Sequence, residues 1–299
     1  MIGWAGTGRM GTVMAGRLLA AGRPVMVWNR TAAKTGPLAE RGALVAASLA
    51  DLASRCEVVF VMVSASADLE QVALGGGGLL RGSGRPGILI DCSTVSEETS
   101  ATVRAAAAAA GVQFLAAPVC GNPGVFADGH GSFIVSGPAV TFQAVRPDLE
   151  RIAGQVTYVG EQEQARLVKL AHNLYLGIMV QSLAEVVTLA EKAGTSRAAF
   201  LEFFNGSAVV SPWIQRRSPE LAARQYDLTF TNELLRKDFD IGLAAARALE
   251  VPMPTASTVY QIIQSAIGTG LRREDFLTLY EHQARGAGLE SVTLHKPQP

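Results

Sequence analysis

The sequence is poor in the residues that form disulfides and bind metals. It has three cysteines and four histidines among 299 residues, and neither residue recurs at the spacing of a metal site. Cys56, Cys92 and Cys120 are too few and too scattered for a disulfide framework, which is typical of proteins from a reducing compartment. We therefore expect a cytoplasmic protein that binds no metal.

Long apolar runs are also missing. No stretch of about 18 uninterrupted apolar residues occurs, which is roughly the minimum that a membrane-spanning helix needs. Arg9 and Arg17 interrupt the apolar N-terminal stretch, and no basic segment precedes it, so it does not have the pattern of a signal peptide. We expect no interaction with a membrane.

An excess of either charge is absent as well. The 26 basic and 26 acidic residues give a formal net charge of zero, whereas proteins that bind nucleic acid or anionic membranes carry basic surfaces. This balance argues against nucleic acid as a partner. We expect a small neutral or acidic molecule as the ligand.

The first half of the chain alternates short apolar runs with alanine-rich segments that are compatible with helices. The expected strands are 2–5, 24–28, 58–63, 87–91, 113–116, 132–136 and 155–159. The expected helices lie near 10–21, 33–41, 48–54, 67–72, 96–110 and 138–152. Such alternation predicts βαβ units, and therefore an α/β domain with a mainly parallel sheet over residues 1–160.

The pattern changes after Gly160. Segment 162–193 carries apolar residues at helical spacing and contains a single glycine, Gly177. Further helical stretches follow at about 196–204, 218–224, 231–248, 254–267 and 274–283. Because 299 residues favour two domains over one, we predict an all-α domain over residues 161–299, joined to the first by the long helix. The tail 291–299 is expected to be irregular and exposed.

The stretch "GTGRMG" occupies residues 6–11. With 31 glycines in the chain, a G-x-G-x-x-G spacing alone is weak evidence. Here, however, the glycines follow an expected strand and open an expected helix, where a dinucleotide-binding turn needs them for the tight turn, the pyrophosphate and helix packing. A glycine-rich turn without a ligand is the alternative. We assign cofactor binding to Gly6, Thr7, Gly8, Arg9, Met10 and Gly11.

The second expected strand is followed by "NRT". Folds of this kind that prefer NAD carry an acidic residue near this point, and it would repel the 2′-phosphate of NADP. Asn29, Arg30 and Thr31 instead offer a neutral amide, a guanidinium and a hydroxyl. This pattern predicts NADP (NADPH) as the cofactor, the alternative being that Arg30 is an ordinary surface charge.

Five segments give the chain a close resemblance to a known family. They are "GTGRMGTVMAGRLLAAGRPVMVWNRT", "DCSTVSEET", "APVCGNPGVFADG", "KLAHN" and "RKDFDIGLAAA". In this order they resemble the β-hydroxyacid dehydrogenases, which include 3-hydroxyisobutyrate dehydrogenases and glyoxylate and succinic semialdehyde reductases. The resemblance implies a Rossmann domain, a long interdomain helix, an all-α domain that commonly forms a homodimer, and a nicotinamide cofactor held between the domains.

The same resemblance implies roles for individual residues, motif by motif. It implies that Lys169 and, one turn beyond it, Asn173 are catalytic. The residues that it places at the cofactor are Val63, Ser64, Thr94 and Lys237. Those that it places at the substrate are Ser93, Thr94, the carboxylate loop Cys120, Gly121 and Asn122, and Phe230 and Asp238 in the helical domain. A solvated charge pair is the alternative for Lys237 and Asp238.

A catalytic role for Lys169 also has a chemical argument that does not depend on the family resemblance. Hydride transfer leaves negative charge on the carbonyl oxygen, so the site needs a positioned proton donor, and a lysine whose pKa is lowered by burial suits this at neutral pH. Leu167, Val168, Leu170 and Ala171 surround Lys169 on an apolar helix. The alternative is a lysine that extends from the helix into water.

The sequence departs from the family where substrate identity is decided. Residues that differ from the usual family pattern are Ala116 in place of an aspartate, Cys120 in place of a serine, Asn122 in place of a glycine and His172 in place of an asparagine, together with Glu97 in place of a proline and Glu163 and Ala165 in place of glycines. The function expected is an NADP(H)-dependent oxidoreductase that moves a hydride between the nicotinamide and a small β-hydroxyacid, aldehyde or keto acid. Two alternatives stay open: an imine reductase-like enzyme, against which the retention of Lys169 argues, and a non-catalytic NADP-binding protein.

Overall fold

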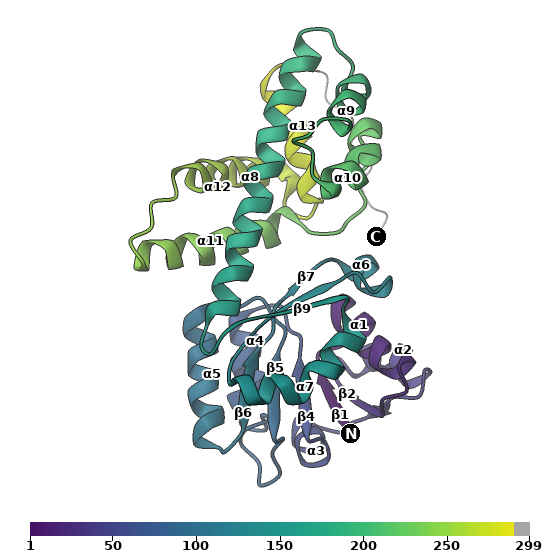
Figure 1. The fold of residues 1–299 in the computed structure, drawn as a ribbon, viewed down its shortest axis with the longest axis vertical. Helices are drawn as coiled ribbons and strands as arrows, with labels where there is room; N and C mark the ends of the chain where they lie inside the picture. The colour runs from purple at the N-terminus through teal and green to yellow at the C-terminus, as the bar shows by residue number, and fades with distance from the viewer. Residues whose placement is uncertain (290–299) are drawn as a thin grey trace. The chain divides into compact units, whose positions relative to one another are not determined.

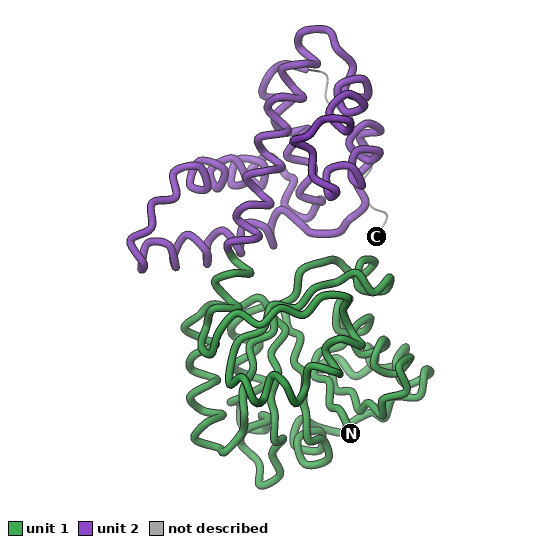
Figure 2. Tube along the Cα trace, viewed as in Figure 1, with its two compact units in different colours: residues 1–170 green, residues 171–299 purple. Residues whose placement is uncertain are grey.

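The computed structural model describes residues 1–289. The chain divides into two compact units, 1–170 and 171–299 (Figure 2). The division falls within one long helix, α8 (Gln164–Lys192), after Leu170. The tail that was expected to be irregular, 291–299, lies outside the described residues.

Unit 1 is built on one mixed sheet (Figure 1). Its strands are β1 (Ile2–Ala5), β2 (Val25–Trp28), β3 (Leu44–Val45), β4 (Val58–Val61), β5 (Ile88–Asp91), β6 (Gln113–Ala116), β7 (Val119–Cys120), β8 (Ser132–Ser136) and β9 (Gln155–Gly160). Their order is β3-β2-β1-β4-β5-β6-β8-β7, and β9 also pairs with β8. Strands β1 to β6 pair in parallel, while β8 is antiparallel to β6 and β7. The predicted mainly parallel Rossmann sheet is thus confirmed.

Alternation along the strands separates two apolar cores. Ile2 and Trp4 of β1 face one core with α1 (Arg9–Ala20), α2 (Gly36–Ala39) and α7 (Ala139–Ile152). Ala5, from the same strand, belongs to the other core, with α3 (Leu49–Arg55), α4 (Ser66–Leu74) and α5 (Glu97–Ala109). Trp4 stacks on Phe60 of β4 with ring centroids 5.1 Å apart. Because successive side chains in a strand point to opposite faces, a sheet covered by helices on both sides reads as a continuous apolar run.

Some elements of unit 1 differ from the expectation. The single helix expected at 33–41 is a 3-10 turn, η1 (Ala32–Thr35), followed by the short α2, which has a proline in its first turn. Strands β3 and β7 and helix α6 (Pro123–Ala127) were not expected. They have two to five residues each, which is too short for a periodic pattern to develop.

Unit 2 contains helices and, among the described residues, no strand beyond an isolated bridge between Thr231 and Asp275. After α8 come α9 (Arg197–Asn205), α10 (Pro212–Ala223), α11 (Asn232–Ala248), α12 (Pro254–Ala266), η2 (Ile267–Leu271), η3 (Phe276–Thr278) and α13 (Leu279–Gly286). Helix α10 begins earlier than expected, because the Ser211 side chain caps it and Pro212 occupies its first turn. The predicted all-α second half is confirmed.

Helix α8 is the one described helix that is long and apolar enough to cross a membrane by those two criteria alone. Half of its most apolar window is buried inside the structure. Leu174, Val180, Leu183 and Val187 of α8 belong to the core of unit 2. Core helices of soluble proteins pass the same test, so this helix is weak evidence for a membrane span.

Candidate active site

The loop between β1 and α1 has the backbone that its glycines predict. Gly6 has a φ of 98°, and a Cβ there would overlap the carbonyl oxygen of Met62. A Cβ on Gly11 would overlap the carbonyl oxygen of Gly6 and lie 2.9 Å from Trp4 Nε1. A side chain at Gly6 would therefore push the loop away from the end of β4, and one at Gly11 would push α1 away from the loop.

Gly8 differs, because a Cβ there would meet nothing within 4 Å. It is the N-cap of α1 and has no side chain with which to cap the helix. Gly8 thus leaves space at the N-terminus of α1, at the carboxyl edge of the sheet, where the helix dipole favours a phosphate. These features fit the pyrophosphate of a dinucleotide.

Asn29 ties this loop to the end of β2. Its Oδ1 accepts a hydrogen bond from Thr7 N at 3.0 Å, and its Nδ2 donates to the Thr31 carbonyl at 3.0 Å. Thr7 Oγ1 in turn donates to the Lys34 carbonyl at 2.9 Å. The Asn29 amide therefore aligns the two loops expected to hold the cofactor, and a direct contact of Asn29 with the ribose stays a prediction.

Arg30 is paired with an acidic residue that the sequence did not predict at this site. Its Nη1 lies 3.0 Å from Oδ1 of Asp68, in the first turn of α4. The Arg30 side chain is 81% exposed and that of Asp68 is 29% exposed. The guanidinium expected at the 2′-phosphate thus has a carboxylate partner in this structure.

The ends of β4 and β5 are joined through Ser93. Its Oγ accepts a hydrogen bond from Val63 N at 2.9 Å, and Asp91 Oδ1 accepts one from Ser93 N at 3.1 Å. Ser93 is fully buried, whereas Thr94 beside it is half-buried. Ser93 therefore shapes the loop, and Thr94 is the more accessible of the two residues expected beside the nicotinamide.

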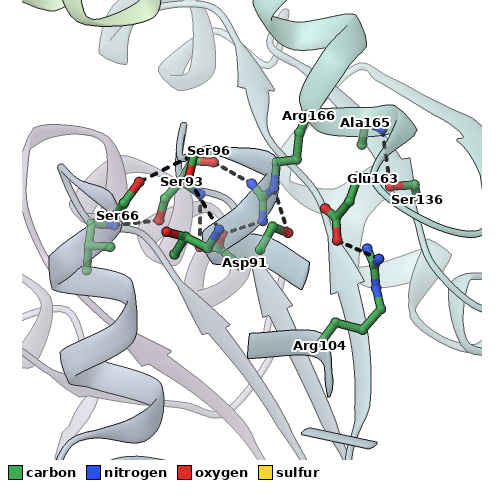
Figure 3. A network of polar contacts seen from close by, with 12 residues as sticks. Ser66, Asp91, Ser93, Ser96, Arg104, Ser136, Glu163, Ala165 and Arg166 are labelled. Atoms are coloured by element: carbon green, nitrogen blue, oxygen red, sulfur yellow. Dashed lines mark hydrogen bonds and ion pairs between the residues drawn. The ribbon is translucent and has the colours of Figure 1, made fainter. Parts of the chain in front are cut away.

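A buried arginine anchors the first turn of α8 to this loop (Figure 3). Arg166 forms an ion pair with Asp91 and donates to the Ser93 carbonyl at 2.5 Å and to Ser100 Oγ at 3.1 Å. Arg166 is 1% exposed and Asp91 is 0% exposed. Arg166 was not expected from the sequence, because a charged residue on an apolar helix carries no sign of a partner 75 positions away.

Two departures from the family pattern, Glu163 and Ala165, lie where α8 is attached to the sheet. Glu163 lies 2.5 Å from Arg104 of α5 (Figure 3), and burial lowers the Arg104 pKa while Glu163 opposes that shift. Ala165 is fully buried, and its N–H donates to Ser136 Oγ at 3.2 Å. Glu163 and Ala165, which replace common glycines, are thus parts of the attachment of α8 to the sheet.

Lys169 lies one turn further along α8. It is 8% exposed, so it does not extend into water as the alternative required. Its Nζ lies 3.7 Å from Cys120 Sγ at the end of β7. The expected catalytic lysine and the expected substrate loop therefore meet within unit 1.

The rest of that loop is shaped by its own turn. Gly121 has a φ of 132°, which favours glycine. Asn122 is the N-cap of α6, because its Oδ1 accepts a hydrogen bond from Val125 N at 3.0 Å. The asparagine in place of a common glycine is thus a capping residue, while its contact with substrate stays a prediction.

In unit 2, the Asn173 amide is held from two sides. Its Nδ2 donates to Asp238 Oδ2 at 2.5 Å, and its Oδ1 lies 2.9 Å from His172 Nδ1. The second contact requires the proton on His172 Nδ1, because an amide oxygen only accepts. Asp238 is 2% exposed and also lies 3.5 Å from Lys237 Nζ, so it is not part of a solvated pair.

Phe230 packs edge-on against Phe276 with ring centroids 5.9 Å apart, and its backbone N–H donates to Asp275 Oδ2 at 3.2 Å. Asp275 is 2% exposed and also accepts from Thr229 N and Oγ1. These bonds fix the segment before α11.

No group of three His, Cys, Asp or Glu side chains that could hold a metal occurs in residues 1–289.

Comparison with known proteins covers both units. Residues 1–160 match the family described as NAD binding domain of 6-phosphogluconate dehydrogenase, and residues 164–282 match NAD-binding of NADP-dependent 3-hydroxyisobutyrate dehydrogenase. The 3-hydroxyisobutyrate dehydrogenase of Pseudomonas aeruginosa is 36% identical over 85% of this chain and 87% of its own length. Glyoxylate/succinic semialdehyde reductase 2 of Arabidopsis thaliana is 29% identical over 94% of this chain and 78% of its own.

A solved structure gives the same result for the fold. Psf3, in complex with NADP+ and 2-OPP, matches with a TM-score of 0.83 and 26% identity, covering 94% of this chain and 99% of that one. The two matched families and this structure account for both the Rossmann unit and the helical unit. They support an NAD(P) cofactor without deciding between NAD and NADP.

Proposed function

Because the chain belongs to the β-hydroxyacid dehydrogenase family of NAD(P)-dependent oxidoreductases, we propose that it is an NADPH-dependent reductase of small aldehydes or keto acids, or equivalently a dehydrogenase of the corresponding β-hydroxyacids. The observation that carries this proposal is the buried Lys169 ammonium 3.7 Å from Cys120. Lys169 acts as the general acid in reduction and as the base in oxidation.

A bound nicotinamide would supply the hydride. Lys169 donates a proton from its ammonium to the carbonyl oxygen as negative charge develops there, and the neutral amine then regains a proton from solvent. Lys169 is 8% exposed, so little water competes with the substrate for its ammonium. Arg166 and Asp91 hold the preceding turn of the helix, so the direction of the Lys169 side chain is set before substrate binds.

Arg30 supports the choice of NADPH, because it is the exposed guanidinium at the end of β2, with no carboxylate at position 29. The Psf3 structure with NADP+ is consistent with this choice. Arg30→Ala should weaken NADPH binding about tenfold and leave NADH nearly unchanged, because charge-assisted hydrogen bonds to the 2′-phosphate are lost. Equal affinities of the wild-type protein for both cofactors would remove this part of the proposal.

Cys120 supports a substrate that differs from those of relatives with a serine at this place. A thiol is a weaker hydrogen-bond donor than a hydroxyl, so it binds a carboxylate less firmly. Cys120→Ser together with Asn122→Gly should therefore improve turnover of short carboxylate-bearing aldehydes. An unchanged substrate profile would mean that the pocket lies elsewhere.

The test is NADPH oxidation with glyoxylate, succinic semialdehyde, tartronate semialdehyde and a cyclic imine as separate substrates. We expect turnover of at least one carbonyl compound and none of the imine. Faster reduction of the imine would favour the imine reductase alternative. Binding of NADPH without turnover of any related substrate would favour the non-catalytic one.

A homodimer through unit 2 is part of the same proposal. On α8, Leu183 and Val187 are buried within their own unit, but Val186 is 44% exposed and Leu189 is 70% exposed. Exposed apolar residues on a helix favour a second apolar surface against them. Light scattering at micromolar concentration should give the mass of a dimer, and Leu189→Lys should shift the protein toward monomer.

The cytoplasmic location of the protein stays a prediction.

A further inference from the structure

The ion pair between Arg30 and Asp68 brings opposite charges together at the expected 2′-phosphate site. Arg30 follows β2, and Asp68 lies 38 positions later in the first turn of α4. Their closest charged atoms, Arg30 Nη1 and Asp68 Oδ1, are 3.0 Å apart. A carboxylate therefore stands within ion-pair distance of the guanidinium that the NADPH proposal requires.

The two partners differ in how firmly the structure holds them. Asp68 is 29% exposed and sits at a helix N-terminus, where the helix dipole favours a negative charge. Arg30 is 81% exposed, so most of its long side chain lies in solvent and is free to reorient. Asp68 is thus the fixed charge of the pair and Arg30 the adaptable one.

We propose that Asp68 determines cofactor specificity by limiting the preference for NADPH over NADH. Its carboxylate competes with the 2′-phosphate for Arg30, and it repels a phosphate that carries a charge near −2. NADH, which has a hydroxyl at this position, meets neither penalty. This inference rests on the proposed role of Arg30 at the 2′-phosphate.

The expected change in NADPH affinity follows from the repulsion between the two negative charges, which water weakens because the site is exposed. At about 6 Å in water, a charge near −2 and a carboxylate repel enough to change affinity roughly tenfold before screening by salt. An exposed ion pair such as Arg30–Asp68 adds little stability of its own. Removal of the Asp68 charge should therefore change cofactor affinity and leave folding almost unaffected.

The experiment is to measure the dissociation constants of NADPH and NADH by calorimetry at low salt, for four proteins: wild type, Asp68→Asn, Arg30→Ala and the double variant. Asp68→Asn should bind NADPH about three to ten times more tightly and NADH within twofold of wild type. In the double variant this gain should shrink, because Arg30 is no longer there to be shared.

Asp51→Asn is the matched control. Asp51 is also in the first turn of a helix, α3, is 28% exposed, and pairs with Arg55 at 3.5 Å. This variant should change the affinity for neither cofactor.

The outcomes separate the two hypotheses. One result refutes the role of Asp68 while the cofactor proposal stands. In it, Arg30→Ala weakens NADPH binding, but Asp68→Asn either leaves NADPH binding unchanged or tightens the binding of NADPH and NADH equally. If Arg30→Ala leaves NADPH binding unchanged, the assignment of Arg30 fails and the inference fails with it.

Discussion

The glycine-rich loop and the first turns of α8 are held in place by different forces. The loop depends on missing side chains, because Gly6 and Gly11 allow the backbone of β1, α1 and the end of β4 to approach closely. The start of α8 depends on charges, through the ion pairs of Arg166 with Asp91 and of Glu163 with Arg104. The first region is specified by glycines whose missing side chains admit neighbouring backbone, and the second by charged partners distant in sequence.

This difference determines how each region responds to substitution. An added methyl group at a close contact affects one turn, and its cost depends on how far the neighbours move. Removal of one member of a buried ion pair leaves an unpaired charge in the interior, which costs far more than the pair itself contributes.

The largest expected effect is on the α8 side. Arg166→Met should lower the free energy of unfolding by about 3 to 5 kcal/mol, because the Asp91 carboxylate would be buried without its partner. Urea unfolding followed by tryptophan fluorescence and circular dichroism measures this. Removal of both charges, in Arg166→Met with Asp91→Asn, should restore part of the loss. A transition at the wild-type urea concentration in the single variant would show that the ion pair does not hold the helix.

Lys169→Met should lower kcat about a hundredfold or more, while NADPH affinity stays within a few fold, because a positioned proton donor is lost and much of the apolar stem remains. The measurement is steady-state kinetics with the best aldehyde of the substrate panel, together with cofactor titration. Lys192→Met, in the last turn of the same helix, is the matched control and should leave both values unchanged. Wild-type turnover in Lys169→Met would eliminate Lys169 as the acid.

Two alanine variants separate folding from binding in the glycine-rich loop. Gly11→Ala should lower the free energy of unfolding by about 1 to 3 kcal/mol, because its Cβ has no room. The Cβ of an alanine at position 8 has open space, so Gly8→Ala should change the free energy of unfolding by less than about 0.5 kcal/mol. It should nevertheless weaken the binding of NADPH and NADH about tenfold. Thermal unfolding and cofactor titration measure the two effects. Equal behaviour of the two variants would contradict the distinct roles of these glycines.

The smallest effect concerns Asn122. Asn122→Ala should cost about 1 kcal/mol of stability through the lost cap of α6, whereas Asn122→Ser keeps a capping oxygen and should cost little. Chemical unfolding of the two variants gives this difference. If both variants raise KM for the aldehyde equally while stability stays unchanged, then Asn122 contacts substrate and its cap is incidental.

Much of the first unit was predictable because its signals are local. Apolar runs of four or five residues bounded by glycine and polar residues correspond to β1, β5, β6 and β8. The glycine spacing correctly predicted a tight turn between β1 and α1. The short β7 and α6 were missed, since β7 is defined by pairing with β8 and α6 by the Asn122 cap.

The candidate site was predictable in its residues and less so in their partners. Lys169, Cys120, Asn173 and Asp238 were expected from the motifs, but not that Lys169 lies beside Cys120 or that Asn173 binds Asp238. Arg166 was missed altogether. The sequence indicates which side chains carry reactive groups, whereas distances between them depend on how strands and helices pack.

By itself, the sequence determined the order of the longer strands and helices, the glycine-rich turn and the absence of an acidic residue at position 29, because each depends on local pattern, on backbone geometry or on residue identity at one place. Only the tertiary structure decided that Asp68 faces Arg30 and that Arg166 meets Asp91. The sheet order places β1 between β2 and β4, and the first turn of α4, which follows β4, meets Arg30, two residues after the end of β2. Charges interact through space, and the fold alone sets that distance.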